Sequence, residues 1–183
     1  MKTRLLNEAI DFATEKHNGQ FRKGTSRPYI THPLEVVQIL EGMGADETLL
    51  IAGVLHDTLE DTDTTKEEIK ERFGQAVVDL VCGHTEDKSQ SWQERKENAI
   101  REVESANLQM KMLVLADKLS NISDMWRDHV EVGEHLWERF HAPKERQAWY
   151  YQSMRKALTP VKNLPQAKKA YQEFERLVLE VFR

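Results

Sequence analysis

The sequence predicts an all-α protein, folded as a single-domain helical bundle. In most segments apolar residues recur at intervals of three and four, which is the spacing of one face of an α-helix. Several of these segments begin at residues that cap helix N-termini, and glycine or proline separates them. No stretch alternates apolar and polar residues as a half-buried strand does.

The first predicted helix covers residues 3–16, where leucine, isoleucine and alanine recur at helical spacing. A loop follows over residues 17–29, because "HNGQFRKGTSRPY" contains two glycines and a proline. The next helix covers residues 30–40, with Pro33 in the first turn, where proline is tolerated. The connector "EGMGAD" ends at Asp46, which we expect to cap the helix containing "LIAGVLHDTLEDTD".

Capping motifs and apolar runs predict the middle helices. Thr65 precedes Glu68 by three residues, which is the spacing of a capping box, and Gly74 ends that helix. "QAVVDLVCGH" predicts a short apolar helix. Two longer helices are expected over "WQERKENAIREVE" and "NLQMKMLVLADKLSNISDMWRD".

The C-terminal region predicts two more helices. "KERQAWYYQSMRKAL" is the first, "TPVKNLP" interrupts the chain, and "QAKKAYQEFERLVLEVF" is the second. Four apolar residues share one face of the last helix: Tyr171, Phe174, Val178 and Val181. We expect this face to pack on the domain, with a homo-oligomer contact as the alternative. We therefore assign residues 1–160 to the functional domain and residues 161–183 to a C-terminal helix packed on it.

Composition and charge exclude several classes of protein. Apolar residues make up 39% of the chain and charged residues 31%, which is typical of a globular protein. The net charge of −5 argues against a general nucleic-acid-binding protein, which needs a basic face. No apolar run approaches the roughly 20 residues that cross a bilayer, and the N-terminus lacks the apolar core of a signal peptide. We therefore expect a cytoplasmic protein without a membrane or nucleic-acid partner. The one cysteine, Cys82, forms no internal disulfide.

Four residues carry the chemistry of metal ligands. His32 starts a predicted helix, His56 and Asp57 end an apolar one, and Asp117 lies within "LVLADKL". A buried carboxylate needs a cation, a hydrogen-bond network or a metal to offset its burial. Taken singly, each of these residues is better explained as a structural polar group, but together they favour a metal site.

Further charged residues surround these candidates. Glu60 and Asp61 each follow a candidate ligand by four residues, so a helix continuing through them would place each pair on one side. Such carboxylates can orient a water molecule and exchange protons with it. Arg22 and Lys23 belong to a basic group just before His32, which favours a role beside a phosphate-rich substrate.

The ordered pattern H…HD…D resembles the HD superfamily of metal-dependent phosphohydrolases. "FRKGTSRPYITHPLEV", "AGVLHDTLEDT" and "LADKLSN" follow in the order seen in the hydrolase domain of the RelA/SpoT family. Within it the chain resembles the small alarmone hydrolases, the group that includes the Mesh1-like enzymes. The resemblance implies an HD-type fold and Mn²⁺-dependent hydrolysis of the 3′-pyrophosphate of guanosine tetra- or pentaphosphate.

The resemblance also implies roles for individual residues. Four match the metal ligands of the family: His32, His56, Asp57 and Asp117. Glu60 and Asp61 match its catalytic pair. Four match residues that contact the substrate: Arg22, Lys23, Asn121 and Tyr150. His84 stands where the family usually carries an apolar residue, and the other histidines, His17 among them, are assigned to surface or structural roles.

Two other functions remain open at this level. An HD phosphohydrolase could act on NADPH or another phosphorylated nucleotide, because the metal binds the phosphate while the rest of the pocket recognises the base. A non-catalytic nucleotide-binding regulator is the other alternative, although the complete ligand set and catalytic pair speak against it. Histidine and carboxylate ligands suit Mn, Fe, Zn or Co, so the metal stays open too.

Overall fold

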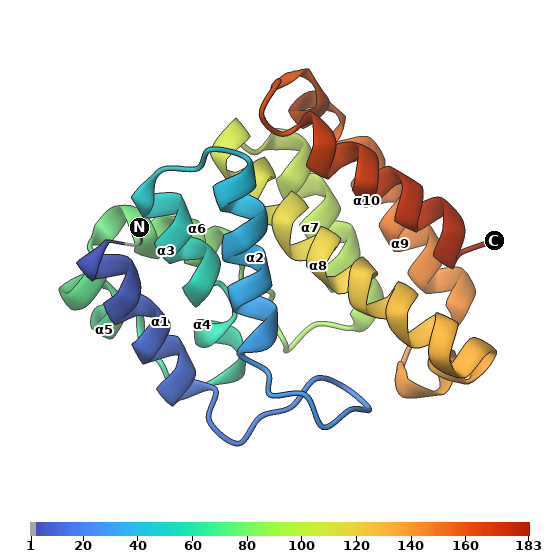
Figure 1. Cartoon of the computed structure of the whole chain (residues 1–183), viewed down its shortest axis with the longest axis horizontal. Coiled ribbons are helices and arrows are strands. Elements are labelled where there is room, and N and C mark those ends of the chain that lie inside the picture. Colours follow the sequence, from blue (N-terminus) through green and yellow to red (C-terminus); the bar gives the residue numbers. More distant parts are fainter. Residues whose placement is uncertain (1–2) are drawn as a thin grey trace. The chain divides into compact units, whose positions relative to one another are not determined.

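The computed structural model describes residues 3–183, which are helical apart from the loop of residues 17–30 and shorter connections, and it confirms the all-α prediction. Within that range the one extended pairing is an isolated bridge between Phe21 and Pro28. The chain forms two compact units, Met1–Glu86 and Asp87–Arg183 (Figure 1, blue to green and green to red). The boundary expected at residue 160 stays a prediction. No described helix is both long enough and apolar enough to span a membrane.

The first unit is built around one short, fully apolar helix. Its elements are α1 (Arg4–Lys16), α2 (Thr31–Gly42), α3 (Glu47–Leu55), α4 (Thr58–Asp61), α5 (Lys66–Phe73) and α6 (Gln75–His84). Helix α3 packs against α1, α2 and α6 (Figure 1). Every residue from Ile51 to His56 is buried, which explains why "LIAGVL" is apolar on all sides. This helix delivers the His56–Asp57 pair to the interior of the unit.

Local capping sets the helix starts, as predicted. The side chain of Asp46 accepts a hydrogen bond from the Leu49 amide at 2.8 Å, which confirms it as the N-cap of α3. Thr65 and Glu68 form a reciprocal capping box at the start of α5. Gly74, with φ of +89°, separates α5 from α6 and adopts a backbone conformation that glycine favours.

Helix α3 ends at Leu55 rather than continuing through the carboxylates. Two carbonyl oxygens that would accept bonds from the next turn accept side-chain hydrogen bonds instead. Gly53 O lies 2.8 Å from His56 Nδ1, and Leu55 O accepts from Thr58 Oγ1 at 2.8 Å. The chain resumes as α4, and Asp61 N donates to Asp57 O at 2.9 Å, so those two residues remain one turn apart.

Helices α2 and α3 approach closely at Gly53. A Cβ atom at this position would overlap Cδ1 of Leu40, a side chain that is completely buried. The absence of a side chain at Gly53 therefore lets the two helices meet. Because α2 carries His32 and α3 leads into His56, this contact brings the two histidines together.

The second unit is organised around a long central helix. Its elements are α7 (Trp92–Ser105), α8 (Leu108–Val132), the 3₁₀ helix η1 (Gly133–Arg139), α9 (Lys144–Ala157), the 3₁₀ helix η2 (Thr159–Asn163) and α10 (Lys168–Val181). Helix α8 runs four residues past the expected end at residue 128, to Val132, and Gly133 with φ of +60° caps it. The segment "TPVKNLP", expected to break the chain, contains η2.

Helix α10 packs along α8 and α9. The four apolar residues expected on one face are all buried: Tyr171, Phe174, Val178 and Val181. The hydroxyl of Tyr171 also donates to Arg155 O at 2.9 Å, which ties α10 to α9.

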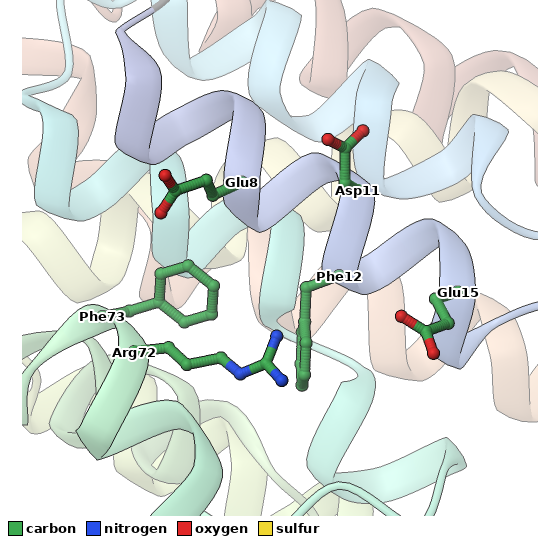
Figure 2. A pocket seen from close by; sticks show the side chains of 6 residues that line it. All are labelled: Glu8, Asp11, Phe12, Glu15, Arg72 and Phe73. Atoms are coloured by element: carbon green, nitrogen blue, oxygen red, sulfur yellow. The ribbon is translucent and has the colours of Figure 1, made fainter.

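A surface pocket of 440 Å³ lies between α1 and the end of α5 (Figure 2). Phe12 and Phe73 form its apolar wall, with the Arg72 guanidinium 4.9 Å from the ring centroid of Phe12. Three carboxylates also line it: Glu8, Asp11 and Glu15. With three carboxylates and one guanidinium the lining has a net negative charge, which disfavours polyphosphates, and it shares no residue with the predicted metal site.

Candidate functional site

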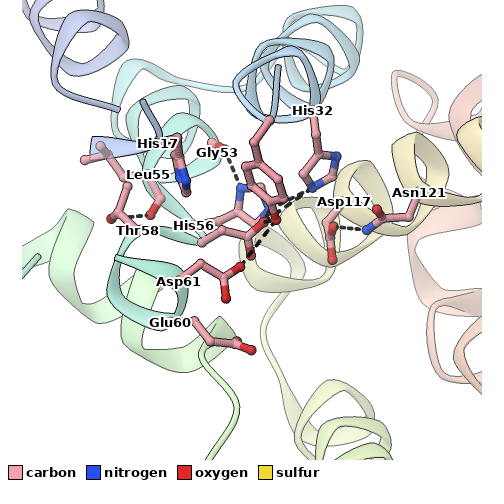
Figure 3. Close-up of polar contacts among 12 residues, drawn as sticks. His17, His32, Gly53, Leu55, His56, Thr58, Glu60, Asp61, Asp117 and Asn121 are labelled. Carbon is pink, nitrogen blue, oxygen red and sulfur yellow. Dashed lines mark hydrogen bonds and ion pairs between the residues drawn. The ribbon is translucent and has the colours of Figure 1, made fainter. Parts of the chain in front are cut away.

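Three of the predicted ligands converge inside the first unit. One donor atom from each of His32, His56 and Asp57 lies within 4.8 Å of the other two. Both imidazoles are buried, and the Asp57 side chain is 16% exposed, so the cluster has limited access to solvent. Figure 3 shows the two histidine side chains pointing toward each other from α2 and from the end of α3, with their rings 75° apart in orientation.

The spacing of these donors fits one divalent ion. His32 Nε2 and His56 Nε2 are 3.1 Å apart, and Asp57 Oδ2 lies 3.0 Å from His56 Nε2 and 3.6 Å from His32 Nε2. Ligands about 2.1 Å from an ion lie roughly 3.0–3.4 Å from one another in octahedral or tetrahedral geometry. Two imidazoles and a carboxylate suit a borderline divalent metal, so the residues present fit the metal that the resemblance implies.

The orientation of His56 is set by the main chain. Its Nδ1 lies 2.8 Å from the carbonyl oxygen of Gly53, and since only a protonated nitrogen can donate there, the proton is assigned to Nδ1. Nε2 is then left with its lone pair toward His32 and Asp57. A ligating histidine commonly donates its second nitrogen in this way.

Tyr29, a residue the sequence analysis did not select, also belongs to this cluster. Its hydroxyl donates to Asp57 Oδ2 at 2.6 Å and lies 3.4 Å from Asp61 Oδ2. Burial, followed by the charge of Asp57, raises the pKa of Tyr29, so the hydroxyl keeps the proton that it donates. Tyr29 lies in the motif "RPYITHP", three residues before His32. This proximity to a predicted ligand was the feature of the sequence that could have indicated its place in the cluster.

The predicted catalytic pair lies on α4, directly after the ligands. Glu60 Oε2 accepts a hydrogen bond from the Glu86 amide at 3.2 Å. Burial is the largest influence on Glu60, and with the nearby charge of Asp57 it raises the pKa of that carboxyl. The backbone carbonyl of Asp61 accepts from Gln20 Nε2 at 2.8 Å, which links α4 to the loop after α1.

The predicted substrate residues of the first unit lie on that loop. The Arg22 guanidinium is 5.7 Å from the ring centroid of Tyr29, while Lys23 is exposed. His17, expected to have a surface or structural role, is buried, and its ring packs on Tyr29 with centroids 4.8 Å apart. His84, which stands where the family usually carries an apolar residue, has its ring centroid 5.2 Å from that of His56.

The other predicted site residues belong to the second unit. Asp117 is buried in α8, where Oδ1 accepts from Asn121 Nδ2 at 2.6 Å and Oδ2 pairs with Lys118 Nζ at 2.7 Å. Burial is the largest single influence and opposes the charge of Lys118, but the Asp117 carboxylate together with Tyr150 and Tyr151 raises the pKa of Lys118. The expectation that Asp117 needs a compensating partner is therefore met by Lys118, which the sequence analysis had not assigned.

Tyr150 lies beside the same lysine. Its ring centroid is 5.7 Å from Lys118 Nζ and 4.9 Å from Lys96 Nζ, and Trp92 packs against its ring at 6.4 Å between centroids. These contacts give the second unit a cationic and aromatic cluster next to Asp117. Positive charge and aromatic faces are suited to phosphates and bases respectively.

Comparison with known proteins adds to this geometry. The HD domain family model matches residues 9–142. The Danio rerio protein named guanosine-3′,5′-bis(diphosphate) 3′-pyrophosphohydrolase MESH1 is 43% identical over 128 residues, which cover 68% of this chain and 71% of that protein. An Aquifex aeolicus protein named guanosine-3′,5′-bis(diphosphate) 3′-pyrophosphohydrolase is 44% identical over 124 residues, which cover 66% of this chain but 18% of that protein.

A solved structure is similar over nearly the whole chain. It is that of a metazoan ortholog of SpoT described as hydrolysing ppGpp, with a TM-score of 0.78 and 29% identity. The match covers 96% of this chain and 96% of that one.

Proposed function

This chain belongs to the HD domain family and groups within it with the MESH1 proteins, and we propose that it removes the 3′-pyrophosphate from guanosine tetra- and pentaphosphate. The products would be GDP or GTP and pyrophosphate. The observation that carries the proposal is the set of three donor atoms 3.0–3.6 Å apart, followed within one helical turn by Glu60 and Asp61. The names of the similar proteins specify the substrate.

His32, His56 and Asp57 are the residues proposed to hold the metal, with Asp117 as a further ligand on the strength of its sequence motif. Mn²⁺ is the metal proposed. A bound divalent ion polarises a phosphoryl oxygen and lowers the pKa of coordinated water toward about 7. The chain itself contributes a fixed His56 tautomer and a carboxylate held by Tyr29.

Glu60 and Asp61 are proposed to orient the attacking water and to handle its protons. Water adds to the phosphorus bonded to the 3′-oxygen, the bond between them breaks, and the 3′-oxygen takes up a proton. Glu60, whose Oε2 accepts a hydrogen bond from the Glu86 amide, is the residue proposed to supply that proton. Asp61 lies at the end of α4 with its backbone anchored to Gln20, which suits it to align the water.

The substrate contacts proposed are Arg22 and Lys23 in the first unit and Asn121 and Tyr150 in the second. Arg22 is positioned over Tyr29, and Lys23 is an exposed cation next to it. Cations of this kind bind phosphate oxygens or stack on a base. We propose the nucleotide as the binding partner and the cytoplasm as the location of the protein. The formation of a homo-oligomer stays a prediction.

A product assay tests the proposal. The full chain is incubated with Mn²⁺ and guanosine tetraphosphate, and separately with NADPH, and the released phosphorus species are separated. We expect GDP and pyrophosphate, abolished in the Asp57→Ala variant. Orthophosphate release from NADPH alone would establish the alternative phosphatase, and nucleotide binding without any turnover would establish a regulator. Metal-dependent turnover that survives Asp57→Ala would overturn the metal assignment.

A further inference from the structure

Tyr29 connects a proposed metal ligand to a proposed catalytic residue. Its hydroxyl donates to Asp57 Oδ2 at 2.6 Å and reaches Asp61 Oδ2 at 3.4 Å. The shorter contact is in the range of a charge-assisted hydrogen bond between a hydroxyl and a carboxylate, which is among the stronger kinds in proteins. The same side chain therefore restrains two carboxylates with different proposed tasks.

The oxygen that Tyr29 contacts is the one that faces the imidazoles. Asp57 Oδ2 lies 3.0 Å from His56 Nε2 and 3.6 Å from His32 Nε2. A carboxylate oxygen has two lone pairs, so it can accept the tyrosine proton with one and still offer the other to a metal. The hydrogen bond thus selects one orientation of Asp57 before any ion arrives.

The loop between α1 and α2 is built to hold Tyr29 in this place. The Tyr29 amide donates to Gln20 O at 2.9 Å, and the Gln20 side chain donates to Asp61 O at 2.8 Å. The buried ring of His17 packs on one side of Tyr29, and its Nδ1 lies 2.8 Å from Gln20 Oε1. Tyr29 is therefore fixed through its backbone, its ring and its hydroxyl.

We propose that Tyr29 is a positioning residue that holds Asp57 in its metal-binding orientation and couples it to Asp61. The loop of residues 17–30 then contributes to metal retention and to catalysis. The inference deepens the proposed function and rests on it for the identity of the metal site. Loss of an outer partner of a metal ligand typically lowers metal affinity or activity by about 10–100-fold.

The test compares Tyr29→Phe with the native protein. Phenylalanine keeps the ring that contacts His17 and Arg22 and removes only the hydroxyl. We expect Mn²⁺ affinity, measured by calorimetry on metal-free protein without substrate, to fall by about 10–100-fold. With saturating Mn²⁺ we expect kcat for guanosine tetraphosphate to fall while KM stays within about twofold. Tyr171→Phe, which removes a buried hydroxyl bonded to Arg155 O, is the matched control and should change neither value.

The outcomes distinguish failure of the Tyr29 proposal from failure of the proposed substrate. Native-like Mn²⁺ affinity in Tyr29→Phe overturns it, whatever nucleotide the protein hydrolyses. If Tyr29→Phe binds Mn²⁺ more weakly than the native protein, but the native protein turns over no guanosine tetraphosphate, the positioning role is supported and the proposed function is refuted. Failure of the native protein to bind Mn²⁺, Fe²⁺, Co²⁺ or Zn²⁺ overturns both. An equal loss in Tyr171→Phe overturns the specific role, because a general loosening would then explain the effect.

Discussion

Replacing Gly53 with alanine tests whether the close contact between α2 and α3 builds the histidine pair. The added Cβ would overlap Leu40 Cδ1, and Leu40 is completely buried, so the side chain cannot swing into solvent. The two helices must then separate or Leu40 must adopt a strained rotamer. Either response moves His32 relative to His56, whose Nε2 atoms are 3.1 Å apart.

Two opposing terms set the size of the effect. Overpacking a well-filled core costs about 1–3 kcal/mol, while alanine gains about 1 kcal/mol over glycine inside a helix. The free energy of unfolding should therefore fall by up to about 2 kcal/mol. In a Leu40→Ala background the new methyl group occupies the vacated space, so Gly53→Ala should become stabilising. The double-mutant coupling should be about 1–3 kcal/mol, the full overpacking cost.

The assay is urea unfolding of the four proteins of this cycle, with Mn²⁺ affinity measured on each folded variant. Gly42→Ala is the matched control, because it adds a methyl group near the end of α2 with no heavy atom within 4 Å. That change should leave stability unaltered or raise it by about 0.4–1 kcal/mol. Equal effects of Gly53→Ala in the two backgrounds, or native Mn²⁺ affinity despite strong destabilisation, would refute the reasoning.

Three further predictions concern single interactions. Burial raises the pKa of Glu60 above its ordinary 4.5, so its contribution to stability is present below pH 4.5 and is lost as pH rises through the folded-state value. The free energy of unfolding of Glu60→Gln should thus rise relative to that of the native protein as the pH increases from 4 to 7. Urea titrations in the presence of a chelator measure this difference, and a difference that does not change with pH would contradict the prediction. Thr65→Ala breaks a capping box and should cost about 0.5–2 kcal/mol in thermal unfolding. Thr14→Ala, the control, removes an exposed hydroxyl on α1 that donates to Ile10 O, and it should not have this cost. Lys118→Met leaves buried Asp117 without its cation and should cost about 3–5 kcal/mol in metal-free urea unfolding, against little change for exposed Lys66→Met.

Sequence reasoning predicted the features that depend on near neighbours. The caps at Asp46 and Thr65 were correct because a capping bond joins residues three apart in the chain. The clustering of His32 with His56 and Asp57 follows from the order of the motif and from apolar helices that had to pack together. The roles of these residues in binding metal stay predictions.

What the sequence could not predict depends on contacts between distant segments. The hydrogen bond from Tyr29 to Asp57 joins residues 28 apart and depends on the conformation of a loop, for which periodicity carries no information. The end of α3 at Leu55 depends on whether His56 and Thr58 bond to nearby carbonyls or point elsewhere. His17 was assigned to a surface or structural role, and only the folded loop shows it buried against Tyr29.

The bond between His56 Nδ1 and the Gly53 carbonyl has a consequence for mutational scanning of this chain. The acceptor is a backbone atom, so no side-chain replacement elsewhere deletes it. A mutational scan would therefore find no side chain whose removal takes away the acceptor for His56 Nδ1. It would instead report sensitivity to size at Gly53, where any side chain meets Leu40. The proton on Nδ1 of this imidazole is thus held by the backbone of α3, while its Nε2 atom faces the side chains of His32 and Asp57.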